Sequence, residues 1–206
     1  AILCDSKLLD SSLQEKYVSH LLSGKSLPIT TKCLSCTMHT IVSTNQTIAI
    51  ARGFSRLDAV FVSLYNSSQA GTKQINTYYH PMGNSSAITK TGDSVRLTVQ
   101  LGSKKIPEYP ISSLSEFYYR LQQAVGLSHG ESMNITSREY HDNSFIMGVN
   151  MEKLSGSEAS YSGLNSKEQL LTLNLEGLTG GVDQAFVCLV YTSVVNITDS
   201  GVQELS

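Results

Sequence analysis

AFVCLVYTSVVNI, residues 185–197, is apolar at nearly every position. Successive side chains of a β-strand point to opposite faces of the sheet, so a half-exposed strand alternates apolar and polar residues. A run without that alternation is typical of a strand that is buried on both faces. This segment is therefore predicted to be a central strand of a sheet or sandwich.

Other segments show strand signals and are separated by turn-forming sequences. The clearest is SVRLTVQL, in which alternate residues are apolar: Val95, Leu97, Val99 and Leu101. In another strand, one face is predicted to consist of Asp58, Val60, Val62 and Leu64. The predicted strands are residues 32–42, 46–52, 56–65, 72–80, 94–101, 144–151, 169–175 and 185–197.

The stretch YPISSLSEFYYRLQQAVG, residues 109–126, has a helical period instead. Ser113 and Glu116 have the spacing of a capping box, and Gly126 is a typical C-terminal stop. The apolar face of this helix would hold Leu114, Phe117, Tyr118, Leu121 and Val125. The outward face would hold Arg120, Gln122 and Gln123. The helix is expected to cover an open end or flank of the strands.

Another helix is predicted near the N-terminus, from a capping box at Ser12 and Glu15 to Gly24. It is expected to pack as a lid on one end of the domain, through an apolar face made of Leu13, Tyr17 and Leu21. A short helix is also predicted at residues 137–140.

These elements predict an all-β fold, an eight-stranded antiparallel jelly-roll sandwich with an N-terminal helix. One further helix is expected in the crossover between the fifth and sixth strands. The expected organisation is an N-terminal helical segment, residues 1–28, and a jelly-roll domain, residues 29–206. The domain is expected to be one roll of a longer protein.

The charge balance disfavours some classes of partner. Lys and Arg number 15 against 17 Asp and Glu, for a net charge of -2, so the basic excess of a nucleic-acid-binding surface is missing. The sequence has no apolar run of about 18 residues, and no membrane span is expected.

The number and spacing of the cysteines match neither a disulfide-rich scaffold nor a zinc motif. Cys33 and Cys36 make a lone CxxC, and on a strand they would point to opposite faces. We interpret them as reduced thiols rather than as a metal or redox pair, and Cys188 as a small buried apolar residue.

The sequence contains the N-x-S/T pattern five times, at Asn45, Asn66, Asn84, Asn134 and Asn196. Such matches arise often by chance, and without a signal peptide we interpret them as incidental. In a piece of a secreted protein they would instead be candidate glycosylation sites.

No catalytic constellation is recognisable. The histidines, at positions 20, 39, 80, 129 and 141, have no metal-binding spacing, and nucleotide-binding and hydrolase motifs do not occur. His141 with Asp142 is assigned to a solvated turn, and Glu152 with Lys153 to a charged strand end. We expect a structural or binding protein without a cofactor or metal, not an enzyme.

Five segments together resemble the C-terminal half of hexon-like, double jelly-roll major capsid proteins, with Polinton-like and adintovirus-like elements as the nearest relatives. They are YPISSLSEFYYRLQQAVG, ITSREY, FIMGVNMEKL, SGLNSKEQLLTLNL and VYTSVVNITDSGVQEL, and the resemblance covers roughly residues 45 to 206. It implies a viral structural protein in the virion, assembled inside the host cell. Partners would be further copies, in a homotrimer or pseudo-hexameric capsomer of an icosahedral shell, and other capsid proteins. This sequence departs from the family in holding strands for a single roll.

Assembly would use surface residues rather than a catalytic site. The candidate interface residues are Arg52, Arg56, Phe117, Tyr118, Tyr119 and Arg120. The alternative is a carbohydrate-binding or adhesive jelly-roll module, in which tyrosines stack on sugar rings. A cupin-type enzyme is a weaker alternative, because no strand holds a histidine-rich metal pattern.

Overall fold

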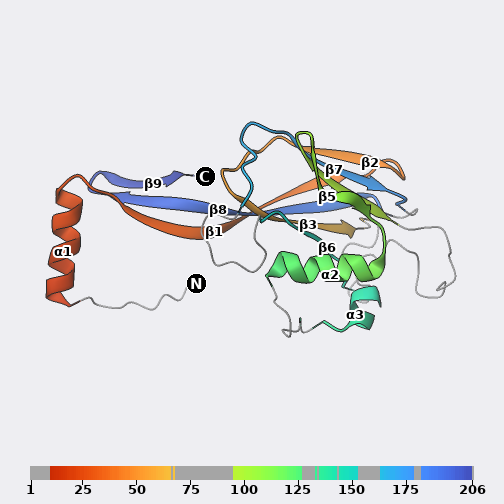
Figure 1. Cartoon of the computed structure of the whole chain (residues 1–206), viewed down its shortest axis with the longest axis horizontal. Helices are drawn as coiled ribbons and strands as arrows, with labels where there is room; N and C mark the ends of the chain where they lie inside the picture. The colour runs from red at the N-terminus through yellow and green to blue at the C-terminus, as the bar shows by residue number, and fades with distance from the viewer. Residues whose placement is uncertain are drawn as a thin grey trace. The chain divides into compact units, whose positions relative to one another are not determined.

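The computed structural model describes residues 10–65, 67, 95–126, 133, 135–142, 144–152, 163–178 and 182–205 (Figure 1). The helices are α1 (Ser11–Leu22), α2 (Leu114–Val125) and α3 (Ser137–Asp142). The strands are β1 (Leu27–Thr40), β2 (Gln46–Ile50), β3 (Leu57–Tyr65), β4 (Arg96–Leu101), β5 (Lys104–Ile111), β6 (Met147–Asn150), β7 (Leu171–Glu176), β8 (Gln184–Thr198) and β9 (Gly201–Leu205). The chain forms two compact units, Lys32–Thr192 and Ala1–Thr31 with Ser193–Ser206.

The strands form two sheets. One has the order β1-β8-β3-β6, with β9 also pairing with β8, and the other has the order β2-β7-β4-β5. Strands β1 to β4 alternate between the two sheets, and so do β5 to β8, which is the pattern of a jelly roll. The last long strand, β8, lies between β1 and β3, which confirms its predicted central position.

The core lies between the two sheets of the larger unit. Val95, Leu97, Val99 and Leu101 are all buried, as their alternation predicts, and so are Asp58, Val60, Val62 and Leu64. The buried carboxylate of Asp58 accepts a hydrogen bond from Thr192 Oγ1 at 2.5 Å. In β8 the prediction is only partly right. Its inner residues Ala185, Val187, Leu189 and Tyr191 are buried, whereas Phe186, Cys188 and Val190 on the other face are half-buried.

Strand β5 is absent from the sequence-based prediction. It contains Pro107 and Pro110, and proline cannot donate to a strand ladder. The structure places β5 at the end of its sheet, where it pairs with β4. Proline is tolerated at such an edge, so the two prolines are compatible with this strand, which the sequence analysis did not predict. The strand predicted at residues 72–80 lies outside the described residues.

Helix α2 agrees closely with its prediction. Ser113 Oγ accepts a hydrogen bond from Glu116 N at 3.2 Å, and Gly126 ends the helix at φ 83°. Phe117 and Leu121 are buried, whereas Val125, predicted on the same apolar face, is 53% exposed.

The helix packs directly on β6 (Figure 1). A Cβ atom on Gly148 of β6 would lie 2.9 Å from Leu121 Cδ1 and 3.1 Å from Leu121 Cα. A glycine at this position therefore permits the close approach of α2 to the sheet.

Helix α3 extends two residues beyond its predicted end at Tyr140. Thr136 and Glu139 form a capping box, in which Thr136 N donates to Glu139 Oε2 at 2.8 Å and Glu139 N donates to Thr136 Oγ1 at 3.2 Å. Tyr140 is buried, its hydroxyl donates to Ile146 O, and burial raises its pKa above the usual value. Its ring packs against Tyr118 and Phe145.

The structure of α1 differs from two predictions. Its N-cap is Asp10, to which Ser12 donates a hydrogen bond, so the predicted capping box of Ser12 and Glu15 is wrong. No residue of α1 is buried, and Leu13 and Tyr17 are 41% and 42% exposed. Two residues of the predicted apolar face are therefore exposed, and the third, Leu21, is half-buried.

Candidate interaction surfaces

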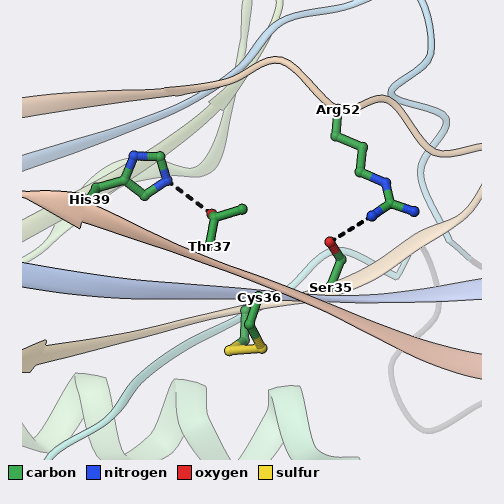
Figure 2. The surroundings of a disulfide bond; sticks show 6 residues. Ser35, Cys36, Thr37, His39 and Arg52 are labelled. Atoms are coloured by element: carbon green, nitrogen blue, oxygen red, sulfur yellow. Dashed lines mark hydrogen bonds between the residues drawn. A yellow bond between two sulfur atoms is a disulfide. The ribbon is translucent and has the colours of Figure 1, made fainter.

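Arg52 lies over a pair of stacked aromatic rings just after β2. The rings of Phe54 and Tyr191 have centroids 4.3 Å apart, and the Arg52 guanidinium carbon is 5.1 Å and 5.6 Å from the two centroids. Arg52 Nη1 also donates to Ser35 Oγ of β1 at 2.9 Å (Figure 2). We call these four residues, Arg52, Ser35, Phe54 and Tyr191, the Arg52 surface.

The neighbours of Arg52 hold its guanidinium group in place, and the side chain is still exposed to solvent. Phe54 and Tyr191 are buried, whereas Arg52 is exposed. Cation–π contacts at exposed sites contribute about 0.5–1 kcal/mol each. In the described part of the chain no carboxylate forms an ion pair with Arg52. The surface therefore offers a positioned guanidinium to a carboxylate of another molecule.

The corner that carries Arg52 is held by backbone contacts. A Cβ atom on Gly53 would lie 2.7 Å from Lys167 Cα, so glycine allows two segments to touch there. Phe54 N donates to the buried Ser166 Oγ at 2.8 Å. Further along, Arg56 is half-buried, and its carbonyl oxygen accepts a hydrogen bond from Thr192 N at 2.9 Å. Arg52 is thus the more accessible of the two arginines.

A second surface joins β5 to α2. Arg120 Nη2 donates to Tyr109 Oη at 3.1 Å, and the guanidinium carbon is 6.0 Å from the centroid of the Tyr109 ring. Gln123 Nε2 donates to Tyr119 Oη at 2.8 Å. Arg120 also forms an ion pair with Glu116, with 3.6 Å between Nη2 and Oε1. We call Tyr109, Tyr119, Arg120 and Gln123 the Tyr109 surface.

This surface combines exposed tyrosines with a half-buried arginine. Tyr109 is 55% exposed and Tyr119 is 48% exposed, whereas 25% of the Arg120 side chain is exposed. The expected outward orientation of Arg120 is therefore only partly realised, because it packs against Tyr109. Tyr109 was not among the predicted interface residues, since the strand that carries it was not recognised.

Phe117 and Tyr118 lie beneath this surface. Phe117 is completely buried and packs edge-on against Phe145 with 5.5 Å between the ring centroids. Tyr118 is half-buried and donates from its hydroxyl to Ile135 O at 3.0 Å. Both residues support α2 from the core side.

A disulfide joins Cys36 of β1 to Cys188 of β8. The predictions of a reduced Cys36 and of a buried, unlinked Cys188 are therefore wrong. The partners are separated by 152 residues, so no local pattern indicates the bond. Cys33 is a free thiol that packs against the core, and Cys36 lies on the other face of the strand, which confirms their predicted opposite orientations.

The described residues contain no group of three or more metal-binding side chains. No helix in the same part of the chain is long and apolar enough to cross a membrane. Two of the N-x-S/T sites are described. Asn45 is exposed and accepts a hydrogen bond from Gly177 N at 3.1 Å, and Asn196 is half-buried in β8. The other three sites, Asn66, Asn84 and Asn134, lie outside the described residues.

No protein-family model and no curated protein matches this sequence. The fold, however, is similar to solved viral structures. One is VP54 of PBCV-1, fitted into a cryo-EM reconstruction of the virophage Sputnik, with a TM-score of 0.60 and 9% identity over 96% of this chain and 55% of that chain. Another belongs to a quasi-atomic model of the PBCV-1 capsid, with a TM-score of 0.59, 10% identity and the same coverage of both chains.

A third similar chain comes from a cryo-EM structure of the Sputnik virophage. Its TM-score is 0.52 at 11% identity, and the match covers 87% of this chain and 39% of that chain. The present chain thus spans about half the length of the first two matches and less of the third. The comparisons and the strand order agree on a jelly-roll fold.

Proposed function

We propose that this chain is a structural subunit of a viral capsid. The observation that carries the proposal is the similarity of nearly the whole chain to capsid-derived jelly rolls, with the sheet orders β1-β8-β3-β6 and β2-β7-β4-β5. The role is non-catalytic and located in the virion, after assembly inside the host cell. A Polinton-like or adintovirus-like lineage rests on the sequence resemblance alone.

In this function the rigid sandwich presents surfaces for contact with neighbouring subunits. The proposed partners are further copies, in a homotrimer or pseudo-hexameric capsomer, and other capsid proteins. Arginine and tyrosine are enriched among residues that contribute about 2 kcal/mol or more to protein interfaces. The Arg52 surface and the Tyr109 surface both expose such side chains on well-packed supports. Repetition by symmetry would multiply modest contacts.

The test is the mass of the full-length protein by size-exclusion chromatography with light scattering, with negative-stain images of the same sample. We expect trimers or shells for the unmodified protein. A variant with both Arg52→Ala and Arg120→Ala should shift toward the monomer. Arg96→Ala is the matched control, because Arg96 is exposed and lies on neither surface.

A clean monomer for the unmodified protein at all concentrations would contradict the capsid proposal. The alternative is a carbohydrate-binding module, which the exposed rings of Tyr109 and Tyr119 favour. It predicts that the monomer binds an immobilised oligosaccharide and that Tyr109→Ala abolishes the binding.

A further inference from the structure

Strand β1 is held weakly by side-chain packing. In the described part of the chain it pairs only with β8. All 14 of its residues are exposed or half-buried, whereas β3 in the same sheet is mostly buried. Segments with few buried apolar contacts open locally at a low free-energy cost. The Cys36–Cys188 disulfide therefore matters more for β1 than it would for a core strand.

Besides its pairing with β8 and the hydrogen bond from Arg52 to Ser35, β1 has few contacts among the described residues. Ile41 N, just after the strand, donates to Asp183 O at 2.7 Å. Lys32 forms an ion pair with Glu152 at 3.7 Å, but its side chain is 68% exposed, and such pairs contribute little to stability. Cys36 lies between these two points and links the strand covalently to the centre of the sheet.

The disulfide is coupled to the Arg52 surface through adjacent residues. Ser35, which accepts the hydrogen bond from Arg52, directly precedes Cys36. Figure 2 shows Ser35 and Arg52 on one side of β1 and the disulfide on the other. Holding Cys36 at β8 therefore fixes the backbone position from which Ser35 reaches Arg52.

The bond is accessible to a small reductant on the Cys36 side. Cys36 is exposed, whereas Cys188 is half-buried. Exposed disulfides are the readily reduced ones, because a thiolate must approach a sulfur atom along the bond. The free Cys33 faces the core, so it cannot attack the disulfide while β1 remains a strand.

We propose that the Cys36–Cys188 disulfide is a reducible lock on β1 and, through Ser35, on the Arg52 surface. When oxidised, the lock keeps the surface formed, and when reduced, it lets the centre of β1 open. The lock is a property of the fold, and its consequence for assembly rests on the proposed function.

The reductant is a low-molecular-weight monothiol. Its thiolate attacks Cys36 Sγ, forming a mixed disulfide and releasing the Cys188 thiolate. A second monothiol attacks the small-molecule sulfur of that mixed disulfide and releases the Cys36 thiolate. The protein disulfide gains two electrons and, on protonation, two protons, and the two monothiols become one small disulfide.

The test is hydrogen exchange of the full chain, followed by mass spectrometry, in oxidised and reduced buffer. Amides in β1 should exchange about 10-fold faster or more after reduction. Amides in β4 and β7 should stay protected in both states. A Cys36→Ser/Cys188→Ser variant should match the reduced protein in both buffers, whereas Cys33→Ser should behave like the unmodified protein.

Equal exchange of β1 in the two buffers would overturn the proposal. Loss of protection in β4 and β7 together with β1 would also overturn it, because the bond would then stabilise the fold as a whole. A reductant effect that persists in the double-serine variant would assign it to another cysteine and overturn it too.

Measuring the formation of trimers or shells in oxidised and in reduced buffer distinguishes this inference from the proposed function. If shells or trimers form only in oxidised buffer, the regulatory role is supported. If they form equally in both buffers although β1 opens, that role is overturned. If no assembly occurs in either buffer while β1 responds to reduction, the proposed function fails and the lock stands.

Discussion

Asp183 shows how one residue can join segments that are distant in sequence. Its carboxylate accepts hydrogen bonds from the backbone N and the hydroxyl of Ser67, 116 residues away. Its backbone N donates to Tyr65 O, and its carbonyl accepts from Ile41 N. The ends of β1 and β3 and the start of β8 thus meet at this residue. The hydrogen bonds from Ser67 lower the pKa of the Asp183 carboxyl group.

The lowered pKa predicts a pH-dependent contribution to stability. Because the folded-state pKa lies below the unfolded value of about 3.9, the stabilisation is present above that pH and is lost as the pH falls through the folded-state pKa. Asp183→Asn should therefore lower the denaturant midpoint at pH 7, with a difference from the unmodified protein that shrinks as the medium becomes strongly acidic. Urea denaturation across the acidic range measures both midpoints. A difference that stays constant with pH would contradict the assignment.

At the scale of single elements, the prediction of helix capping boxes was right once, was wrong once and missed one box. The box at Ser113 and Glu116 was predicted, and its N-cap hydrogen bond is present. The box at Ser12 and Glu15 was predicted, but Asp10 begins the helix instead. The box at Thr136 and Glu139 was not foreseen. A capping sequence thus marks a possible helix start. In α1 the Ser12 hydroxyl donates to Asp10, the residue before the helix, and does not begin the helix itself.

Ser113→Ala should lower the free energy of unfolding by about 0.5–2 kcal/mol, because Glu116 N would lose its capping acceptor. Ser115→Ala is the control, since Ser115 is an exposed residue within the same helix. Chemical denaturation of the two variants measures the comparison. Equal stability of the variants would show that the cap does not stabilise α2.

For the whole molecule, stability depends on the core between the two sheets. Leu173 of β7 is completely buried and pairs with Ile48 on one side and Val99 on the other. Its side chain therefore lies at the centre of a four-stranded sheet.

Leu173→Ala should lower the free energy of unfolding by about 2–5 kcal/mol, because it removes buried methyl groups and leaves a cavity. Leu170→Ala makes the same chemical change at a side chain that is 54% exposed, and it should cost less than about 0.5 kcal/mol. Thermal or chemical denaturation measures both. Similar losses for the two variants would contradict the placement of the core.

Sequence reasoning named only some residues of the two candidate surfaces. It selected Arg52, Tyr119 and Arg120, since arginines near a corner and tyrosines on a helix are typical of protein contacts. It did not select Tyr109 or Ser35, which contact the two arginines. These contacts join separate elements, and no spacing within one element reveals them.

The sequence by itself determined the β-rich class, the central position of the last long strand and the extent of α2. These features follow from alternation, apolar runs and end signals, which are local properties of the chain. Only the tertiary structure decided that β5 is a strand, that Cys36 bonds to Cys188, and that aromatic rings support Arg52. The physical reason is that an edge position, a disulfide partner and a cation–π contact each depend on residues that folding brings together from distant parts of the chain.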